Sequence, residues 1–347
     1  MKSVCTSVLV FMFFMVHAQP ITSKFPKEFN EHGNKRVDNY YWLNTPDSFT
    51  ISHLQIENAY LEAYMKPTGA LQDKLYKEIV GRMEQKMESL PVKSNGYWYY
   101  SRFENGAQYP KYFRRKNNMQ AKEELILDVP DLAKDHNIFL VWNRRVSPDN
   151  RYMAYAVDTT GSRRGTLFIK DLHTGKLLKE VVYPMSGSLA WSSDSKILFY
   201  TIADKTVRSY KVMQHIIGTD QKTDKEIYTE NDVTFSIGLS ASQDNRYIFI
   251  ISNSTDVSEA RFIDATQPGK APVLIQERQK GLKYFPSYYG GNVFYLYTNK
   301  DAINFKVVNT PVADPSLKNW KDIVPHKADE FIDEYYVLKN HLVVQSK

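Results

Sequence analysis

The sequence predicts an all-β fold, a β-propeller of which this chain holds about five blades and part of a sixth, preceded by a short helical arm. The first observation is a repeat. A turn rich in Ser, Asp, Asn and Gly, followed by a run of bulky apolar residues, recurs at steps of 45, 50, 47 and 49 residues. Propeller blades repeat at about 40 to 50 residues. The successive turns are marked by Asp149, Asp194, Asp244, Gly291 and Asn340.

The second observation is that the apolar runs have no polar face. In Tyr152–Val157 both sets of alternating positions are apolar, and Ile248–Ile251 repeats this pattern. A strand with one wet face alternates apolar and polar residues instead. Strands that are apolar on both faces belong to a sheet covered on each side by another sheet, as in stacked propeller blades.

The remaining strands of each blade are predicted from hairpin signals. In residues 165–183, two strand-like runs flank a turn at His173-Thr174-Gly175. A short glycine-containing turn between two such runs is typical of a β-hairpin. Similar signals recur in the other copies, so the partial propeller is predicted to span residues 90–347.

Residues 19–89 differ in character and predict the helical arm. The first of two helical patterns ends before Pro67, because proline cannot continue a helix. In the second pattern, apolar residues recur at every fourth position and form one stripe. The stripe consists of Leu71, Leu75, Ile79 and Met83. Since the propeller strands cover one another, we expect this stripe to pack on a different surface.

Residues 1–18 are predicted to be a cleavable secretory signal peptide. Lys2 precedes the apolar run Val4–Val16, and Val16-His17-Ala18 supplies a cleavage site. The alternative is an uncleaved anchor, but this run is short for a hydrocarbon core of about 30 Å. We therefore expect a periplasmic or secreted protein without stable membrane insertion.

The composition limits the classes of function. The chain has 347 residues, 42% of them hydrophobic, and a net charge of +6, which is typical of a globular protein. Its one cysteine, Cys5, lies in the predicted signal peptide, which excludes disulfides and thiolate chemistry from the mature chain. The pairs Arg114-Arg115, Arg144-Arg145 and Arg163-Arg164 fall in different units, which favours solvated surface over a nucleic-acid-binding stripe.

Motifs for catalysis and for metal or nucleotide binding do not occur in the sequence. There is no G-x-S-x-G nucleophile elbow, no H-E-x-x-H and no glycine-rich phosphate loop. The nearest match, Gly238-Leu239-Ser240-Ala241-Ser242, ends in serine and lies in a predicted strand, so Ser240 is not expected to be a nucleophile. His173 and His341 fall in predicted turns, and we expect the histidines to be surface or hairpin residues. We therefore predict no catalytic, cofactor-binding or metal-binding residue.

Two further sets of residues are given structural roles. Glu123-Glu124 and Asp333-Glu334 are neighbours on predicted strands, so their side chains point to opposite faces and cannot share one acid/base site. Trp142 and Trp191 each lie a few residues before a repeated turn. We expect both indole rings to pack in the core between blades rather than to bind a ligand.

Several segments of the arm and the repeats are recognisable as family motifs. They are Arg36–Asn44, Glu57–Thr68, Gly96–Arg102, Gln108–Lys116, Ser147–Gly175, His215–Gln221 and Asn319–His326. In these segments the chain resembles oligopeptidase B, a branch of the prolyl oligopeptidase family of serine peptidases. The resemblance implies a seven-bladed propeller that caps an α/β-hydrolase domain carrying a Ser, Asp, His triad, which cleaves short peptides after Arg or Lys. It also implies that the arm packs on the hydrolase domain.

By the same resemblance, Lys347 falls within the sixth blade and the triad lies beyond it, so no family catalytic residue is carried onto a position here. We expect this chain alone to be inactive, with its own hydrolase domain as partner and short basic peptides as substrates of the full-length enzyme. No cofactor and no nucleic acid is expected. The alternative is a stand-alone propeller that binds peptides or a protein partner without chemistry. A dipeptidyl-peptidase relative is a third option, which the matched segments support less.

Overall fold

The computed structural model describes residues 19–84, 86–104 and 106–347, which form two compact units with the first ending at Glu84. The predicted signal peptide, residues 1–18, lies outside the described residues and stays a prediction. Within the described ranges no helix is long and apolar enough to span a membrane.

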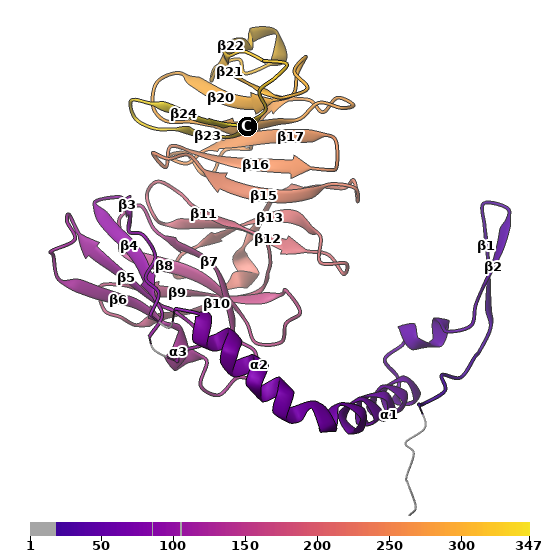
Figure 1. The fold of residues 1–347 in the computed structure, drawn as a ribbon. Helices are drawn as coiled ribbons and strands as arrows, with labels where there is room; N and C mark the ends of the chain where they lie inside the picture. The colour runs from indigo at the N-terminus through magenta and orange to yellow at the C-terminus, as the bar shows by residue number, and fades with distance from the viewer. Residues whose placement is uncertain (1–18, 85, 105) are drawn as a thin grey trace, which may run out of the picture. The chain divides into compact units, whose positions relative to one another are not determined.

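The first unit is a β-hairpin followed by two consecutive helices (Figure 1). Its elements are β1 (Lys27–Glu31), β2 (Asn34–Asp38), η1 (Tyr41–Asn44), α1 (Ser48–Met65), η2 (Lys66–Thr68) and α2 (Gly69–Arg82). The carboxylate of Asp47 caps α1 by accepting a hydrogen bond from the Thr50 N–H at 2.9 Å. As predicted, α1 ends before Pro67, which lies in the 3₁₀ turn between the helices.

Most of the large apolar side chains of both helices are exposed. The predicted stripe, with Leu71, Leu75 and Ile79 in α2 and Met83 at its C-cap, is 47–61% exposed. In α1 the exposed apolar side chains lie around most of the helix circumference rather than in one stripe. They are Phe49, Ile51, Leu54, Ile56, Leu61, Tyr64 and Met65. A helix that is apolar on several sides is typically enclosed in the working protein.

The second unit contains, among its described residues, five four-stranded antiparallel sheets and one two-stranded sheet. The first two sheets are β3 (Val92–Ser94), β4 (Tyr97–Arg102), β5 (Lys111–Lys116) and β6 (Glu123–Asp128), then β7 (Leu140–Val146), β8 (Tyr152–Asp158), β9 (Gly165–Asp171) and β10 (Leu177–Met185). The short helix α3 (Val129–Leu132) lies between them in sequence.

The third to sixth sheets complete the unit. The third and fourth are β11 (Leu189–Trp191), β12 (Ile197–Ala203), β13 (Ser209–Ile216) and β14 (Lys225–Thr229), then β15 (Ser236–Ala241), β16 (Tyr247–Asn253), β17 (Ser258–Asp264) and β18 (Val273–Gln276). The fifth and sixth are β19 (Tyr284–Ser287), β20 (Val293–Thr298), β21 (Lys306–Pro311) and β22 (Lys321–Val324), then β23 (Ile332–Val337) and β24 (Leu342–Ser346). Two 3₁₀ turns, η3 (Gln221–Thr223) and η4 (Leu317–Asn319), precede β14 and β22.

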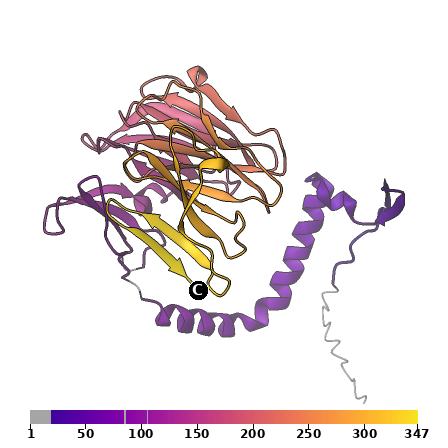
Figure 2. The same cartoon turned by 90° about the horizontal axis from the view of Figure 1, so that it is seen from above.

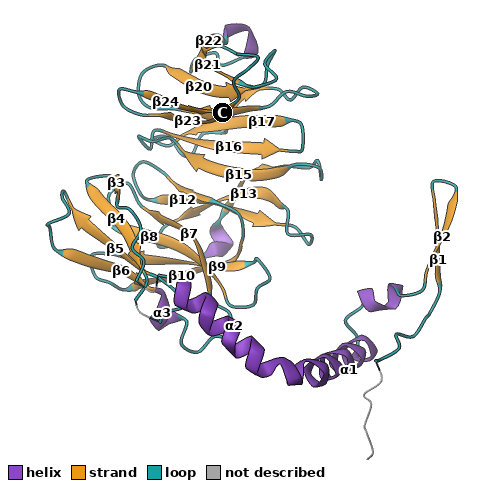
Figure 3. Ribbon diagram, in the orientation of Figure 1, coloured by secondary structure: helices purple, strands orange, loops and turns teal. Residues whose placement is uncertain are grey.

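Each four-stranded sheet is a meander in which strands pair in chain order. Figures 1 and 3 show the sheets following one another around the unit, and Figure 2 shows the same succession from above. This is the topology of propeller blades. The predicted fold class, all-β with five complete blades and part of a sixth, is confirmed.

The core lies between neighbouring sheets, and the second strands of the second, third and fourth sheets are largely buried. In β8 every residue from Met153 to Asp158 is buried, and the central parts of β12 and β16 are buried on both faces. This confirms the stacking inferred from the two apolar faces. In the fifth sheet β20 differs, because Phe294 and Leu296 are buried while Tyr295 is half-buried. The sheet that follows the fifth sheet in the described residues, β23–β24, has only two strands and so covers less of it than a four-stranded sheet would.

The repeated turn has one internal structure in three sheets. The hydroxyl of Ser242 donates to Asp244 at 2.7 Å and accepts a hydrogen bond from the Tyr247 N–H at 2.9 Å. The residue after the aspartate is left-handed, as at Asn245 with φ of 57°. Ser147 and Ser192 form the same contacts at equivalent positions. The repeat in the sequence therefore encodes a hydrogen-bonded turn, with an αL residue that Asn and Asp tolerate well.

These turns also bond to one another, and we call the resulting row of contacts the turn belt. Its contacts are Asn95 Nδ2 to Pro148 O at 3.0 Å, the Asp149 N–H to Ser195 Oγ at 3.1 Å, Ser193 Oγ to Asn245 O at 2.6 Å and the Gly290 N–H to Asp244 Oδ2 at 3.0 Å. Each contact joins one sheet to the next. The belt therefore ties the first five sheets together along one face of the unit.

Candidate functional site: a guanidinium cage between two sheets

Charged side chains gather at the opposite ends of the strands, where one sheet connects to the next. Glu230 directly follows β14 and Phe235 directly precedes β15, so the connection between the third and fourth sheets supplies both. Glu259 lies near the start of β17, and Arg278 follows β18. Because strands in a meander alternate in direction, these four positions meet at one face of the unit.

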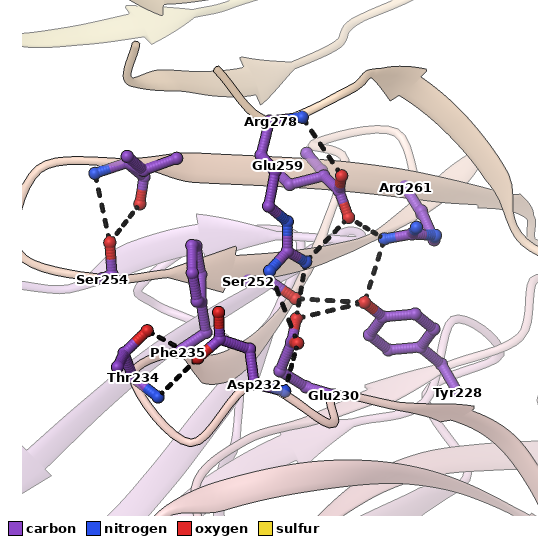
Figure 4. A network of polar contacts seen from close by, with 12 residues as sticks. Tyr228, Glu230, Asp232, Thr234, Phe235, Ser252, Ser254, Glu259, Arg261 and Arg278 are labelled. Atoms are coloured by element: carbon purple, nitrogen blue, oxygen red, sulfur yellow. Dashed lines mark hydrogen bonds and ion pairs between the residues drawn. The ribbon is translucent and has the colours of Figure 1, made fainter. Parts of the chain in front are cut away.

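Arg278 is held by two carboxylates and an aromatic ring (Figure 4). Its Nη2 lies 2.8 Å from Glu230 Oε2 and 3.0 Å from Glu259 Oε1. The guanidinium carbon lies 4.1 Å from the centre of the Phe235 ring, which is a cation–π contact. We call Glu230, Glu259 and Phe235 the guanidinium cage.

Contacts independent of Arg278 hold the cage carboxylates in place. Glu230 accepts a hydrogen bond from the Asp232 N–H at 3.0 Å and another from the Tyr228 hydroxyl at 3.2 Å. Glu259 pairs with Arg261, which also donates to the Tyr228 hydroxyl at 3.0 Å. Figure 4 shows these groups converging from the third and fourth sheets. The cage is therefore positioned by the strands that carry it.

The electrostatics keep both carboxylates ionised. Burial favours the neutral acid, and the two glutamates are only 3% and 5% exposed. Burial is the largest single influence and raises the pKa of each carboxyl. The hydrogen bonds and charges of Arg278, together with those of the Asp232 N–H at Glu230 and of Arg261 at Glu259, outweigh it, so the pKa of Glu230 and the pKa of Glu259 both lie below the ordinary value. The hydrogen bond to Glu259 likewise raises the pKa of Arg278. A carboxylate held ionised is a poor proton donor, so the cage is suited to binding a cation rather than to acid catalysis.

Arginines also tie the neighbouring connections together. Arg208, which pairs with Asp204 at 2.9 Å, donates to the Phe235 carbonyl at 2.8 Å. Arg164 donates to the Asp204 carbonyl at 2.9 Å. The chain around the cage is therefore fixed by further charge-assisted hydrogen bonds.

The serines of the nearest elbow-like match have backbone roles. Ser240 lies in β15, paired with Phe249 of β16, and Ser242 belongs to the repeated turn described above. The Ser242 hydroxyl donates to a carboxylate and accepts from the backbone. The structure does not bring either serine into a hydrogen bond with a described histidine.

The histidines divide into two groups. His173 and His341 lie in the turns after β9 and β23, as expected. The expectation of surface or hairpin positions is wrong for His215, which lies in β13 and is fully buried. Its Nδ1 lies 2.7 Å from Asp224, whose other oxygen accepts from the Tyr200 hydroxyl at 2.9 Å. The pairing satisfies one of the two ring nitrogens and so reduces the cost of burying the imidazole, while Nε2 is buried without a hydrogen-bond partner. The partner, Asp224, lies outside the strand that carries His215, so patterns within one strand do not reveal it.

The carboxylate pairs and tryptophans occupy the predicted environments. Glu123 contacts Arg102 and Arg115, while its neighbour Glu124 contacts Arg114, so the two point to different partners. Asp333 contacts Gln345 and Lys347, whereas Glu334 contacts the Tyr336 hydroxyl. Trp142 and Trp191 pack in the cluster between the second and third sheets, with Trp191 4% exposed. Nothing in the described residues groups three or more His, Cys, Asp or Glu side chains as metal ligands.

The arginine pairs are less solvated than expected. Arg114 is 5% exposed, stacks on the Tyr97 ring at 4.3 Å and bonds to Glu124 at 2.7 Å. Arg144 stacks on the Tyr112 ring at 4.0 Å, and its burial lowers its pKa. Aromatic stacking explains why these cations tolerate burial. Arg163 remains exposed.

The sequence model of the prolyl oligopeptidase N-terminal β-propeller domain matches residues 20–347. This chain belongs to the prolyl oligopeptidase family. Among curated members, it is 37% identical over 336 residues to dipeptidyl aminopeptidase BI of Pseudoxanthomonas mexicana, which covers 91% of this chain and 46% of that protein. It is 31% identical to protease 2 of Moraxella lacunata, with 94% of this chain and 48% of that protein covered. The chain therefore spans about half the length of these relatives.

Solved structures of prolyl oligopeptidase family members confirm the resemblance to oligopeptidase B. Oligopeptidase B from Leishmania major matches with a TM-score of 0.88 and 26% identity, over 95% of this chain and 49% of that one. Oligopeptidase B from Trypanosoma brucei, solved with covalently bound antipain in a closed form, matches with a TM-score of 0.87 and 26% identity over the same shares. The fold described above is therefore that of the N-terminal part of these peptidases.

Proposed function

We propose that this chain is the propeller part of an oligopeptidase B-like serine peptidase that hydrolyses short peptides after Arg or Lys. In this proposal the reaction is performed by an α/β-hydrolase domain corresponding to the other half of the relatives. The propeller restricts access, so that flexible peptides reach the nucleophile and folded proteins do not. The family match over residues 20–347 carries the proposal.

The exposed arm supports a hydrolase domain as partner. The stripe of α2 has 47–61% of its surface exposed, and α1 is apolar on several sides. Apolar surface of this extent is stabilised by a covering surface. The inner strands of the second unit are buried between neighbouring sheets, whereas α1 and α2 contain no buried apolar residue.

The proposal is tested by comparing the chain alone with a chimera. Residues 19–347 are joined to the remaining half of the Moraxella lacunata relative, and cleavage of a fluorogenic peptide after Arg is measured. We expect turnover from the chimera that a serine-reactive inhibitor abolishes, and none from this chain alone. Turnover by the chain alone would refute the assignment of chemistry to the other half. A folded chimera that cleaves after residues other than Arg or Lys would refute the basic specificity.

A second candidate activity is release of dipeptides from a free N-terminus. It is favoured by the 37% identity to a relative named dipeptidyl aminopeptidase BI. Paired Arg-containing substrates with free and acetylated N-termini distinguish the two activities in the same chimera. Equal cleavage supports the endopeptidase, whereas loss of cleavage on acetylation supports dipeptide release. A stand-alone binding propeller predicts instead that the chain alone binds peptides and the chimera gains nothing.

We also propose that residues 1–18 direct export, so that the mature protein is periplasmic or secreted. The apolar run and the small-residue cleavage site support this proposal. Expression in a bacterial host followed by N-terminal sequencing of the exported protein is expected to give Gln19 as the first residue. Retention of Met1 in a cytoplasmic product would contradict it.

A further inference from the structure

The guanidinium cage and its occupant come from different parts of the chain. Glu230 and Phe235 belong to the connection between β14 and β15, and Glu259 belongs to β17. Arg278 lies 48 residues from Glu230, on the connection that follows β18. The cage carboxylates also bond to Arg261, Tyr228 and the Asp232 backbone, and none of these contacts passes through Arg278. These bonds are independent supports for the two carboxylates.

The occupant is attached to an exposed segment. Glu277, Gln279 and Lys280 around Arg278 are exposed, and the arginine side chain itself is 31% exposed although both carboxylates are nearly buried. A movement of this connection alone would withdraw the guanidinium. Two carboxylates would then face the single cation of Arg261, which leaves the cage with an uncompensated negative charge.

The geometry selects a guanidinium over other cations. Glu230 accepts from both arms of the guanidinium fork, from Nη1 at 3.5 Å and Nη2 at 2.8 Å, and Glu259 accepts from Nη2 at 3.0 Å, while the Phe235 ring offers a face to the planar cation. A lysine ammonium would use one acceptor pair and would gain less from the ring. These are the features of a site for an arginine side chain.

We propose that the guanidinium cage is a binding site for arginine side chains of peptides, which Arg278 occupies in cis and a peptide arginine occupies when the connection after β18 moves. The cage follows from the contacts above, while the assignment of peptides as ligands rests on the proposed function.

The test uses the full chain with Arg278→Met, which empties the cage and keeps an apolar stem. The probes are Nα-acetylarginine amide and the neutral isostere Nα-acetylcitrulline amide, and the readout is the thermal unfolding midpoint. At about ten times its dissociation constant, the arginine probe is expected to raise the midpoint of the variant by about 3 °C relative to citrulline. Wild-type protein, whose cage is filled, is expected to show no such difference.

Two further variants locate the effect. Arg246→Met removes an arginine that pairs with the single carboxylate of Asp264 at 2.9 Å, and it is expected to give no arginine-specific shift. Adding Glu259→Gln to Arg278→Met is expected to abolish the shift. An equal response to both probes in Arg278→Met, or an equal arginine response in the wild type, would overturn the proposal.

A variant that does not fold still gives an answer. Arg278→Met is then refolded from denaturant in each probe, and the recovery of folded protein is measured. Greater recovery in the arginine probe supports the cage, and equal recovery contradicts it. These readouts need no peptidase activity. The two proposals can fail separately. If the cage binds arginine but the chimera does not cleave after Arg, the proposed function is refuted and the arginine-binding site still stands.

Discussion

The backbone N–H of Gly290 donates a hydrogen bond to the carboxylate of Asp244, 3.0 Å away, and so joins the turn after β19 to the turn after β15. The same carboxylate accepts from the Ser242 hydroxyl at 2.7 Å. One side chain thus organises its own turn and connects it to the next sheet.

Asp244→Ala is therefore expected to destabilise the chain by about 1 to 3 kcal/mol, because it removes the acceptor of several hydrogen bonds. Urea unfolding at neutral pH measures the loss. The control is Asp256→Ala in an exposed turn of the same sheet, which is expected to stay within about 0.5 kcal/mol of wild type. Equal losses in the two variants would show that the belt contact contributes nothing.

The cage predicts a dependence of stability on pH. The pKa values of Glu230 and Glu259 are lowered in the folded chain relative to the ordinary 4.5. Between those lowered values and 4.5 the unfolded chain binds more protons than the folded chain. The stability that the two ionised carboxylates contribute is therefore present at neutral pH and is lost as the pH falls through this range. Glu259→Gln is expected to lose about 3 kcal/mol at pH 7 and to show a smaller further loss between about pH 5 and pH 3. Parallel pH profiles for variant and wild type would contradict this.

We predict that the hydroxyl group of Tyr284 alone contributes strongly to the stability of the fold. Its hydroxyl accepts hydrogen bonds from the Ala260 N–H at 2.8 Å and the Gln276 N–H at 3.2 Å, in a fully buried position. Tyr284→Phe leaves these donors unpaired and is expected to cost about 2 to 4 kcal/mol by thermal or urea unfolding. Tyr183→Phe, at a site 57% exposed, serves as the matched control and is expected to be nearly neutral.

Gly165 is predicted to be required for packing rather than for backbone freedom. A Cβ at this position would lie 2.7 Å from Cζ2 of Trp142, well inside contact distance. Gly165→Ala is expected to displace the indole and to destabilise the chain by about 1 to 3 kcal/mol. Gly269→Ala places its Cβ in open space and is expected to be neutral or slightly stabilising. Unchanged tryptophan fluorescence and stability in Gly165→Ala would contradict the packing argument.

The blades were predictable from sequence because their determinants are local and repeated. The Ser242 turn and the apolar strand that follows it lie within a dozen residues, and each copy reinforces the next. The cage was not predictable in this way, since Glu259 and Arg278 are 19 residues apart and Glu230 and Arg278 are 48 apart, with no periodicity. The burial of His215 depends in the same way on a partner contributed by the following turn. Such pairs are defined by folding and have no signature within one strand.

The turn belt has a mechanical consequence. Its contacts join adjacent sheets only, and they act beside the apolar clusters that fill the same junctions. Losing one belt contact would therefore free the turns at that junction while the buried side chains still hold the two sheets together.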